Sequence, residues 1–137
     1  MRILCIDPGE KRIGIAISDP TGTIASPLTV LEHVARRVDA AVIAQLAQEH
    51  DTGRIVVGHP LDADNRATPQ SRRAYRLAAA IREQTHLPVV LWDETGSTQA
   101  ARAAHIEMNT SRRERRGHLD QIAATVILQS YLDAHPT

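Results

Sequence analysis

The first third of the chain alternates apolar and polar residues in the pattern of β-strands. Residues 1–7 alternate and are rich in Ile and Leu, and residues 12–18 form a second run rich in β-branched side chains. The Asp, Pro and Gly residues between them are typical of a turn, so the two runs predict a hairpin. A second turn at residues 19–22 leads into a third stretch, residues 23–31, with a break near Pro27. We therefore expect three successive antiparallel strands.

The middle of the chain alternates helical and strand patterns. Residues 54–58, RIVVG, are a short and wholly apolar run of the kind found in buried parallel strands. Before them, residues 34–50 carry apolar residues at helical spacing. This spacing predicts a helix with a core-facing stripe formed by Val38, Ala41, Val42 and Leu46.

A second helix is predicted by its start signal as well as by its stripe. Thr68 is a typical N-cap residue, and Pro69 fits the first helical position. Residues 87–92 then predict a fifth strand. The stripe of the helix, at the spacing i, i+3, i+4 and i+7, consists of Ala74, Leu77, Ala78 and Ile81.

The last third of the chain contains two more helical patterns separated by a polar segment. Ser97 or Thr98 can cap an Ala-rich helix that runs to Ala104, and residues 108–117 are polar and Arg-rich, which predicts a loop. We expect Asp120 to open the last helix. Its apolar positions are Leu119, Ile122, Ala123, Val126, Ile127 and Leu132.

The order of elements is therefore β-β-β-α-β-α-β-α-α. This order predicts an α/β protein whose mixed five-stranded sheet has three antiparallel strands, then two parallel ones, with helices on both faces. A length of 137 residues corresponds to a single domain, residues 1–137. Because no strand-to-helix turn carries a Gly-rich phosphate loop, the sequence does not support a Rossmann or P-loop protein.

Charge adds little until its distribution is considered. The formal net charge is +0, from 16 basic and 16 acidic residues, but Lys11 is the only lysine. The remaining basic residues are arginines, which suit bidentate phosphate contacts, and two dense runs lie at residues 72–76 and 112–116. A solvated helix face explains each run equally well. Aromatic residues make up 2% of the chain, too few for a base-stacking platform.

Three acidic residues occupy positions where an α/β sheet gathers its ligands. Asp7 closes the first strand, Glu94 follows the fifth, and Asp120 opens the last helix. If the first and fifth strands run parallel, their acids meet at one edge of the sheet. Converging carboxylates repel unless a hard cation such as Mg²⁺ or Mn²⁺ holds them. The alternative is a turn residue, a surface acid and a carboxylate favoured by the helix dipole.

A set of motifs, in order from end to end of the chain, narrows these alternatives. Together they resemble the YqgF (RuvX-like) family, whose members are described as Holliday junction resolvases or pre-16S rRNA nucleases. The DPG motif alone is weak, whereas the whole set in a chain of this length is specific. The motifs are Ile6-Asp7-Pro8-Gly9, Lys11-Arg12-Ile13-Gly14, Ser18-Asp19, Val56-Val57-Gly58-His59-Pro60-Leu61, Leu91-Trp92-Asp93-Glu94 and Asp120-Gln121-Ile122-Ala123-Ala124.

The resemblance implies a ribonuclease H-like fold and a metal-dependent nuclease that hydrolyses phosphodiester bonds. Asp7, Glu94 and Asp120 take the place of the acidic, catalytic and metal-binding site. We expect two Mg²⁺ or Mn²⁺ ions about 3.5–4 Å apart, with Asp7 bridging both and the other two acids holding one each.

The implied substrate is a nucleic acid, either the 5′ end of precursor 16S rRNA or a branched DNA junction. We expect basic residues to position its phosphate backbone. Two departures from the family pattern weaken this expectation locally: Thr95 and Gly96 replace an Arg and a bulky apolar residue, and His59 replaces a Leu. The expected backbone-binding residues are Lys11, Arg12, Arg112, Arg113, Arg115 and Arg116.

Five further residues have bland as well as functional interpretations. His59 follows a strand at the same edge and is more easily explained as structural than as a ligand, and His118 is equally well explained as a helix-start residue or a proton relay. Asp93 should lie on the face opposite Glu94, because side chains alternate along a strand. Asp19 fits a turn and Cys5 fits the core.

The main alternative function is a non-catalytic nucleic-acid-binding factor in transcription or ribosome assembly. One cysteine, no apolar stretch long enough for a membrane span and no signal peptide pattern predict a cytoplasmic protein without a membrane partner. A resolvase that cuts two symmetric strands works as a two-fold homodimer, whereas an RNA-processing nuclease can act as a monomer. The sequence leaves both open.

Overall fold

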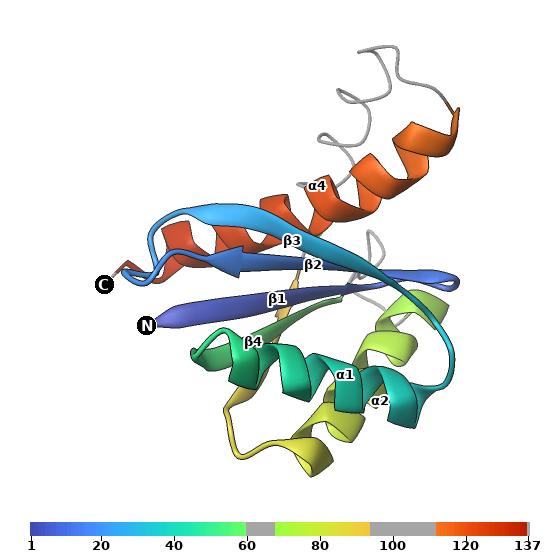
Figure 1. Cartoon of the computed structure of the whole chain (residues 1–137), viewed down its shortest axis with the longest axis horizontal. Coiled ribbons are helices and arrows are strands. Elements are labelled where there is room, and N and C mark those ends of the chain that lie inside the picture. The colour runs from blue at the N-terminus through green and yellow to red at the C-terminus, as the bar shows by residue number, and fades with distance from the viewer. Residues whose placement is uncertain (60–67, 94–111, 137) are drawn as a thin grey trace.

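The computed structural model describes residues 1–59, 68–93 and 112–136, and of residues 112–121 the backbone alone. Five strands form a sheet in the order β3-β2-β1-β4-β5 (Figure 1). The strands are β1 (Arg2–Pro8), β2 (Arg12–Ser18), β3 (Ala25–Glu32), β4 (Thr52–His59) and β5 (Val89–Asp93).

Strand directions follow the expected mixed pattern. β1 pairs antiparallel with β2 and β2 antiparallel with β3, while β1 pairs parallel with β4 and β4 parallel with β5. The register of β2 and β3 shifts between Ile15 and Ala16, where Ala16 lies opposite Pro27, so the predicted break in the third strand is confirmed. Since β1 and β5 run in the same direction, their carboxyl ends lie at the same edge of the sheet.

Helices cover both faces of the sheet, as predicted. Figure 1 shows α1 (Arg36–Glu49) and α2 (Pro69–Gln84) on one face and α4 (Arg112–Ala134) on the other. The side chains of β1 alternate between the two cores. Leu4 and Ile6 pack under α1 and α2, whereas Ile3 and Cys5 pack under α4. Within the described residues, no helix combines the length and the apolar character that a membrane span requires.

The helix α2 begins as its sequence predicts. The Thr68 side chain accepts a hydrogen bond from the Ser71 N–H, the Ser71 hydroxyl oxygen accepts one from the Thr68 N–H, and Pro69 takes the first helical position. This reciprocal pair satisfies two backbone donors that the helix leaves free. All four predicted stripe residues, Ala74, Leu77, Ala78 and Ile81, are buried.

The predicted core face of the first helix is wrong. Val38 and Val42 are 46% and 39% exposed, and Ala41 is exposed as well. The buried positions of α1 are Asp39, Ala40, Ile43 and Ala47, with Leu46 packed at the margin. Two alanines facing inward allow a close approach of α1 to its neighbours, and apolar spacing alone could not distinguish this face from the adjacent valine row.

The start of the last helix is also later in the prediction than in the structure. α4 begins at Arg112, so residues 112–117 are helical and the predicted loop is wrong there. A helical segment that is polar on all sides has no apolar periodicity to reveal it. The predicted helix from Ser97 or Thr98 to Ala104 lies outside the described residues.

Candidate active site

Asp7 is a buried carboxylate at the carboxyl end of β1. It is 6% exposed and pairs across the hairpin with Gly14 of β2. Because Ile3 and Cys5 belong to the core beneath α4, the alternation of β1 puts Asp7 on that same face. Burial of a charged group is costly unless partners compensate it, and Asp7 does have an interaction partner.

The carboxyl end of β5 lies at the same edge, two strands away. Val57 of β4 is aligned with Ile6 on one side and with Leu91 on the other, and the next β4 residue, Gly58, is aligned with Trp92. Trp92 packs against the core beneath α4, whereas Leu91 packs on the opposite side. The predicted ligand Glu94 directly follows this strand and lies outside the described residues.

Asp120 is in the third turn of α4 and does not open the helix as predicted. Eight residues precede it in the helix, so an attraction to the N-terminal dipole does not account for it. Its position is four residues before Ala124, in line with the row through Leu128 and Leu132 that packs on the sheet.

Two polar links hold the other end of α4. The Gln129 side chain accepts a hydrogen bond from the Ala25 N–H at 2.9 Å and donates one to the Thr23 carbonyl oxygen at 3.0 Å. The Arg54 guanidinium donates to the Tyr131 hydroxyl at 2.8 Å. These contacts fix the C-terminal half of α4 against β3 and β4, and thereby set where its N-terminal half runs.

Of the three predicted acids, Asp7 is the one whose side chain the structure describes. Among the described residues, no group of three or more His, Cys, Asp or Glu side chains is placed to hold a metal ion. A buried carboxylate at a strand end is a donor that Mg²⁺ or Mn²⁺ accepts, and Gly58 beside it adds no side chain. The described side of the site therefore fits a hard cation.

The predicted basic residues fall into two places. Lys11 and Arg12 lie in the hairpin that follows Asp7, at the same sheet edge. Lys11 is exposed, and its carbonyl oxygen accepts a hydrogen bond from the His33 N–H at 2.8 Å. Arg112, Arg113, Arg115 and Arg116 occupy the first turns of α4, and their side chains lie outside the described part.

His59 belongs to the other face of the sheet from Asp7. Its ring lies 5.3 Å from that of Tyr75 on α2, and its Nδ1 atom is buried without a hydrogen-bond partner among the described residues. Burial lowers the pKa of His59, and the charge of Asp93 partly opposes this. The structural interpretation is therefore favoured over a role beside Asp7.

Asp19 and Cys5 have the bland roles expected of them. The Asp19 carboxylate accepts hydrogen bonds from the Ile24 and Thr23 N–H groups and from Thr21, and these bonds, led by that of Ile24, hold its pKa well below its usual range. Cys5 is fully buried in the core. The side chain of His118 lies outside the described part.

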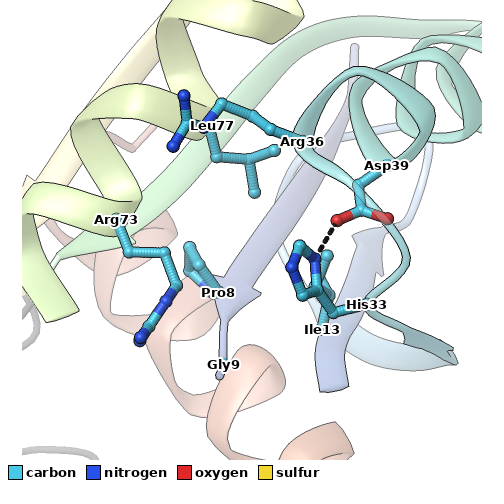
Figure 2. Close-up of a pocket in the computed structure, with 8 residues that line it drawn as sticks. All are labelled: Pro8, Gly9, Ile13, His33, Arg36, Asp39, Arg73 and Leu77. Carbon is cyan, nitrogen blue, oxygen red and sulfur yellow. Dashed lines mark hydrogen bonds and ion pairs between the residues drawn. The ribbon is translucent and has the colours of Figure 1, made fainter. Parts of the chain in front are cut away.

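One feature at this edge escaped the sequence-based prediction. A cavity of about 180 Å³ lies between α1, α2 and the end of β1, on the face opposite Asp7 (Figure 2). The signal for it was weak: two arginines, Arg36 and Arg37, begin α1, where the helix dipole disfavours cations. The lining residues are Pro8, Gly9, Ile13, His33, Arg36, Asp39, Arg73 and Leu77.

Comparison with known proteins adds a family to this geometry. Residues 1–134 match the family described as "RuvX: Holliday junction resolvase". The chain is 41% identical over 134 residues to a protein of Syntrophus aciditrophicus named "Putative pre-16S rRNA nuclease", covering 98% of this chain and 89% of that protein. A protein of Geobacillus kaustophilus with the same name is 40% identical over 136 residues, covering 98% and 99%.

Solved structures with the same fold include two resolvases. T. thermophilus RuvC in complex with a Holliday junction substrate superposes with a TM-score of 0.61 at 14% identity, covering 98% of this chain and 94% of that one. The fowlpox virus resolvase in complex with Holliday junction DNA gives a TM-score of 0.58 at 16% identity and full coverage of both chains. At these identities the likeness establishes the ribonuclease H-like fold predicted from the sequence.

Proposed function

Because the chain belongs to the RuvX family, we propose that it is a metal-dependent nuclease whose active site is built on Asp7. The observation that carries the proposal is the position of this carboxylate. It is buried at the carboxyl end of a central strand, on the face that α4 covers, where ligands of α/β sheets gather. Glu94 and Asp120 complete the proposed acidic site.

The spacing along α4 supports a place for Asp120 beside Asp7. Gln129 bonds to Ala25, and the strand register puts Ala25 at the level of Ile3. From Ile3 to Asp7 the strand advances about 13 Å, and about nine residues of helix cover that length. Since α4 runs antiparallel to β1 (Figure 1), nine residues before Gln129 is the position of Asp120.

Alternation along β5 supports a place for Glu94. Val90 and Trp92 pack on the side of α4, and residue 94 continues that series if the strand direction persists. Asp93 belongs to the opposite series with Leu91. The adjacent acids Asp93 and Glu94 therefore form a natural pair for experiment, one expected at the site and one away from it.

Mg²⁺ or Mn²⁺ ions held by these carboxylates would activate a water molecule and stabilise the leaving 3′ oxygen. Asp7 is the central ligand because its strand lies between the other contributors. Lys11 and Arg12, in the hairpin after Asp7, bind the phosphate backbone near the scissile bond, and the arginines that begin α4 bind it farther away. Such contacts position a substrate without reading its sequence.

For the substrate we propose the 5′ end of precursor 16S rRNA, branched DNA, or both. The first comes from the names of the relatives at about 40% identity, and the second from the description of the family. Cleavage of two symmetric strands requires a two-fold homodimer, whereas trimming of rRNA does not. A single, buried cysteine is compatible with a reducing compartment such as the cytoplasm.

The test is a cleavage assay on a precursor rRNA fragment, a plain duplex and a four-way junction. Each is incubated with wild-type protein in Mg²⁺, in Mn²⁺ and in EDTA, and with Asp7→Asn. We expect metal-dependent cleavage that Asp7→Asn reduces about a thousandfold or more, since it removes the central charge of the site. Binding without cleavage in either metal would contradict the proposal and favour the non-catalytic binding factor.

A further inference from the structure

The cavity between α1, α2 and the end of β1 is cationic. Arg36 comes from the first residue of α1 and Arg73 from the second turn of α2, and both line the cavity. In Figure 2 Arg36 reaches from α1 toward α2, while Arg73 extends beside Pro8 and Gly9. Neither guanidinium has a hydrogen bond or an ion pair within the described chain. Two cations that approach one cavity without anionic partners repel each other unless an anion joins them.

The single carboxylate of the cavity does not supply that anion. Asp39 is 3% exposed and already engaged, because it accepts hydrogen bonds from the Val34 N–H at 3.1 Å and from the His33 ring at 2.5 Å. These bonds hold Asp39 against the start of α1, away from Arg73. The imidazole of His33 thus lines the cavity together with the two arginines.

The dimensions and lining indicate a phosphate group. A volume of 180 Å³ is about six times the share of one water molecule in the liquid, enough for a tetrahedral phosphate. Apart from the imidazole of His33, the lining has no aromatic ring on which a base could stack. Guanidinium groups match phosphate oxygens with paired hydrogen bonds, and Arg is the preferred residue for this recognition.

The position of the cavity connects it to the proposed active site. Pro8 and Gly9, which line it, follow Asp7 directly, and successive strand residues project to opposite faces. A Cβ atom on Gly9 would lie 2.2 Å from the Arg12 carbonyl oxygen, so glycine keeps this turn tight. A strand that crosses the carboxyl edge of the sheet therefore meets Asp7 on one side and the cavity on the other.

We propose that the cavity lined by Arg36, Arg73 and His33 is a phosphate-binding site that holds a phosphate of the substrate strand next to the scissile position. The identity of the strand as substrate rests on the proposed function. The same chemistry would accept free phosphate or a mononucleotide, and the experiment separates these sources.

The test compares two double variants of equal charge. Arg36→Ala with Arg73→Ala removes the cavity cations, and Arg37→Ala with Arg72→Ala removes exposed neighbours on the same helices that do not line the cavity. In one arm, thermal unfolding is followed in inorganic phosphate and in chloride at equal ionic strength. In the other, binding of labelled single-stranded and duplex oligonucleotides is titrated against salt in EDTA, where no cleavage occurs.

We expect phosphate to raise the melting temperature of the wild type and of the control, but not of the cavity variant. Oligonucleotide binding by the cavity variant should be roughly tenfold weaker than by the control, with a salt slope lower by about 0.7–0.9 per lost contact. A response in the phosphate arm alone would identify free phosphate or a nucleotide as the ligand. Equal behaviour of both variants in both arms would overturn the proposal.

Two additional variants keep the outcomes separate. Gln in place of Arg36 and Arg73 preserves side-chain length without charge, and serves if the alanine variant fails to fold by circular dichroism. Asp7→Asn tests the proposed function, and should leave metal-free binding and the phosphate response unchanged. A nuclease without the phosphate site and a phosphate site without nuclease activity therefore give different results.

Discussion

The two faces of the sheet are covered in different ways. On one, α1 and α2 lie side by side over an aliphatic core that contains Ile43 and Ile81. On the other, α4 alone crosses the strands, and polar links such as Trp92 Nε1 to Ser130 Oγ at 3.3 Å and Arg54 to Tyr131 accompany the core around Ile127. Figure 1 shows the N-terminal part of α4 continuing beyond the sheet.

The difference indicates how the molecule divides stability and chemistry. The paired helices bury one face, whereas α4 is fixed at its C-terminal half and carries Asp120 toward the end of β1 that holds Asp7. A helix anchored at one end and extended at the other can deliver side chains to a strand end. On this account, disturbance of either core lowers stability, but disturbance beneath α4 also reduces cleavage.

Truncation of one core residue on each face is the strongest test of this division. Ile81 and Ile127 are both fully buried. Their replacement by Ala should lower the free energy of unfolding by about 2–5 kcal/mol in each case, because each leaves a cavity. Denaturant unfolding measures the loss, and cleavage is assayed at a temperature where both variants are folded. Ile127→Ala should cleave more slowly than Ile81→Ala, and equal rates would contradict the division.

Arginines on α4 and α2 allow the comparison to be made at the surface. Replacing Arg112, Arg113, Arg115 and Arg116 by Ala should weaken binding to all sequences alike and flatten its salt dependence, with up to about 0.9 in slope per lost contact on duplex DNA. Oligonucleotide binding is titrated against salt in the Asp7→Asn background to prevent cleavage. The matched control, Arg72→Ala with Arg76→Ala on α2, should change the slope less. An unchanged slope in the quadruple variant would move the binding surface to α2.

A smaller effect should appear in the pH dependence of stability. Burial lowers the pKa of His59, so the unfolded chain binds this proton more readily than the folded one. Stability contributed by neutral His59 is therefore complete above its ordinary pKa of 6.5 and is lost as the pH falls below it. Urea unfolding between about pH 5 and 8 should show this loss, and His59→Gln should reduce it. If His59→Gln instead changed cleavage as much as Asp7→Asn, the assignment of His59 to the structural face would be wrong.

Where turn residues and a one-sided apolar pattern agreed, the sequence predicted the elements closely. The bounds of β2 at residues 12–18 and the Thr68 cap of α2 are confirmed. The pattern failed for α1, where Val38 competes with Ala40 and Ile43 for the inner face, since apolar spacing does not report which row has the closer neighbour. It also missed the first turns of α4, because a helix that leaves the sheet needs no apolar side.

The candidate site was predictable in part for the same reason. Asp7 ends an alternating strand, so its edge and its face follow from the pattern of β1. The phosphate cavity did not, because Arg36 and Arg73 are brought together by the packing of two helices, 37 residues apart in sequence, and neither lies in a local motif.

The most direct test of the account is Mn²⁺ binding to the adjacent acids at the end of β5, measured by calorimetry without substrate. Alternation assigns Glu94 to the side of Asp7 and Asp93 to the side of α2. The account predicts that Glu94→Gln weakens Mn²⁺ binding by at least about tenfold, while Asp93→Asn leaves it unchanged. Wild-type affinity in Glu94→Gln, or a loss confined to Asp93→Asn, would contradict a metal site on the face that α4 covers.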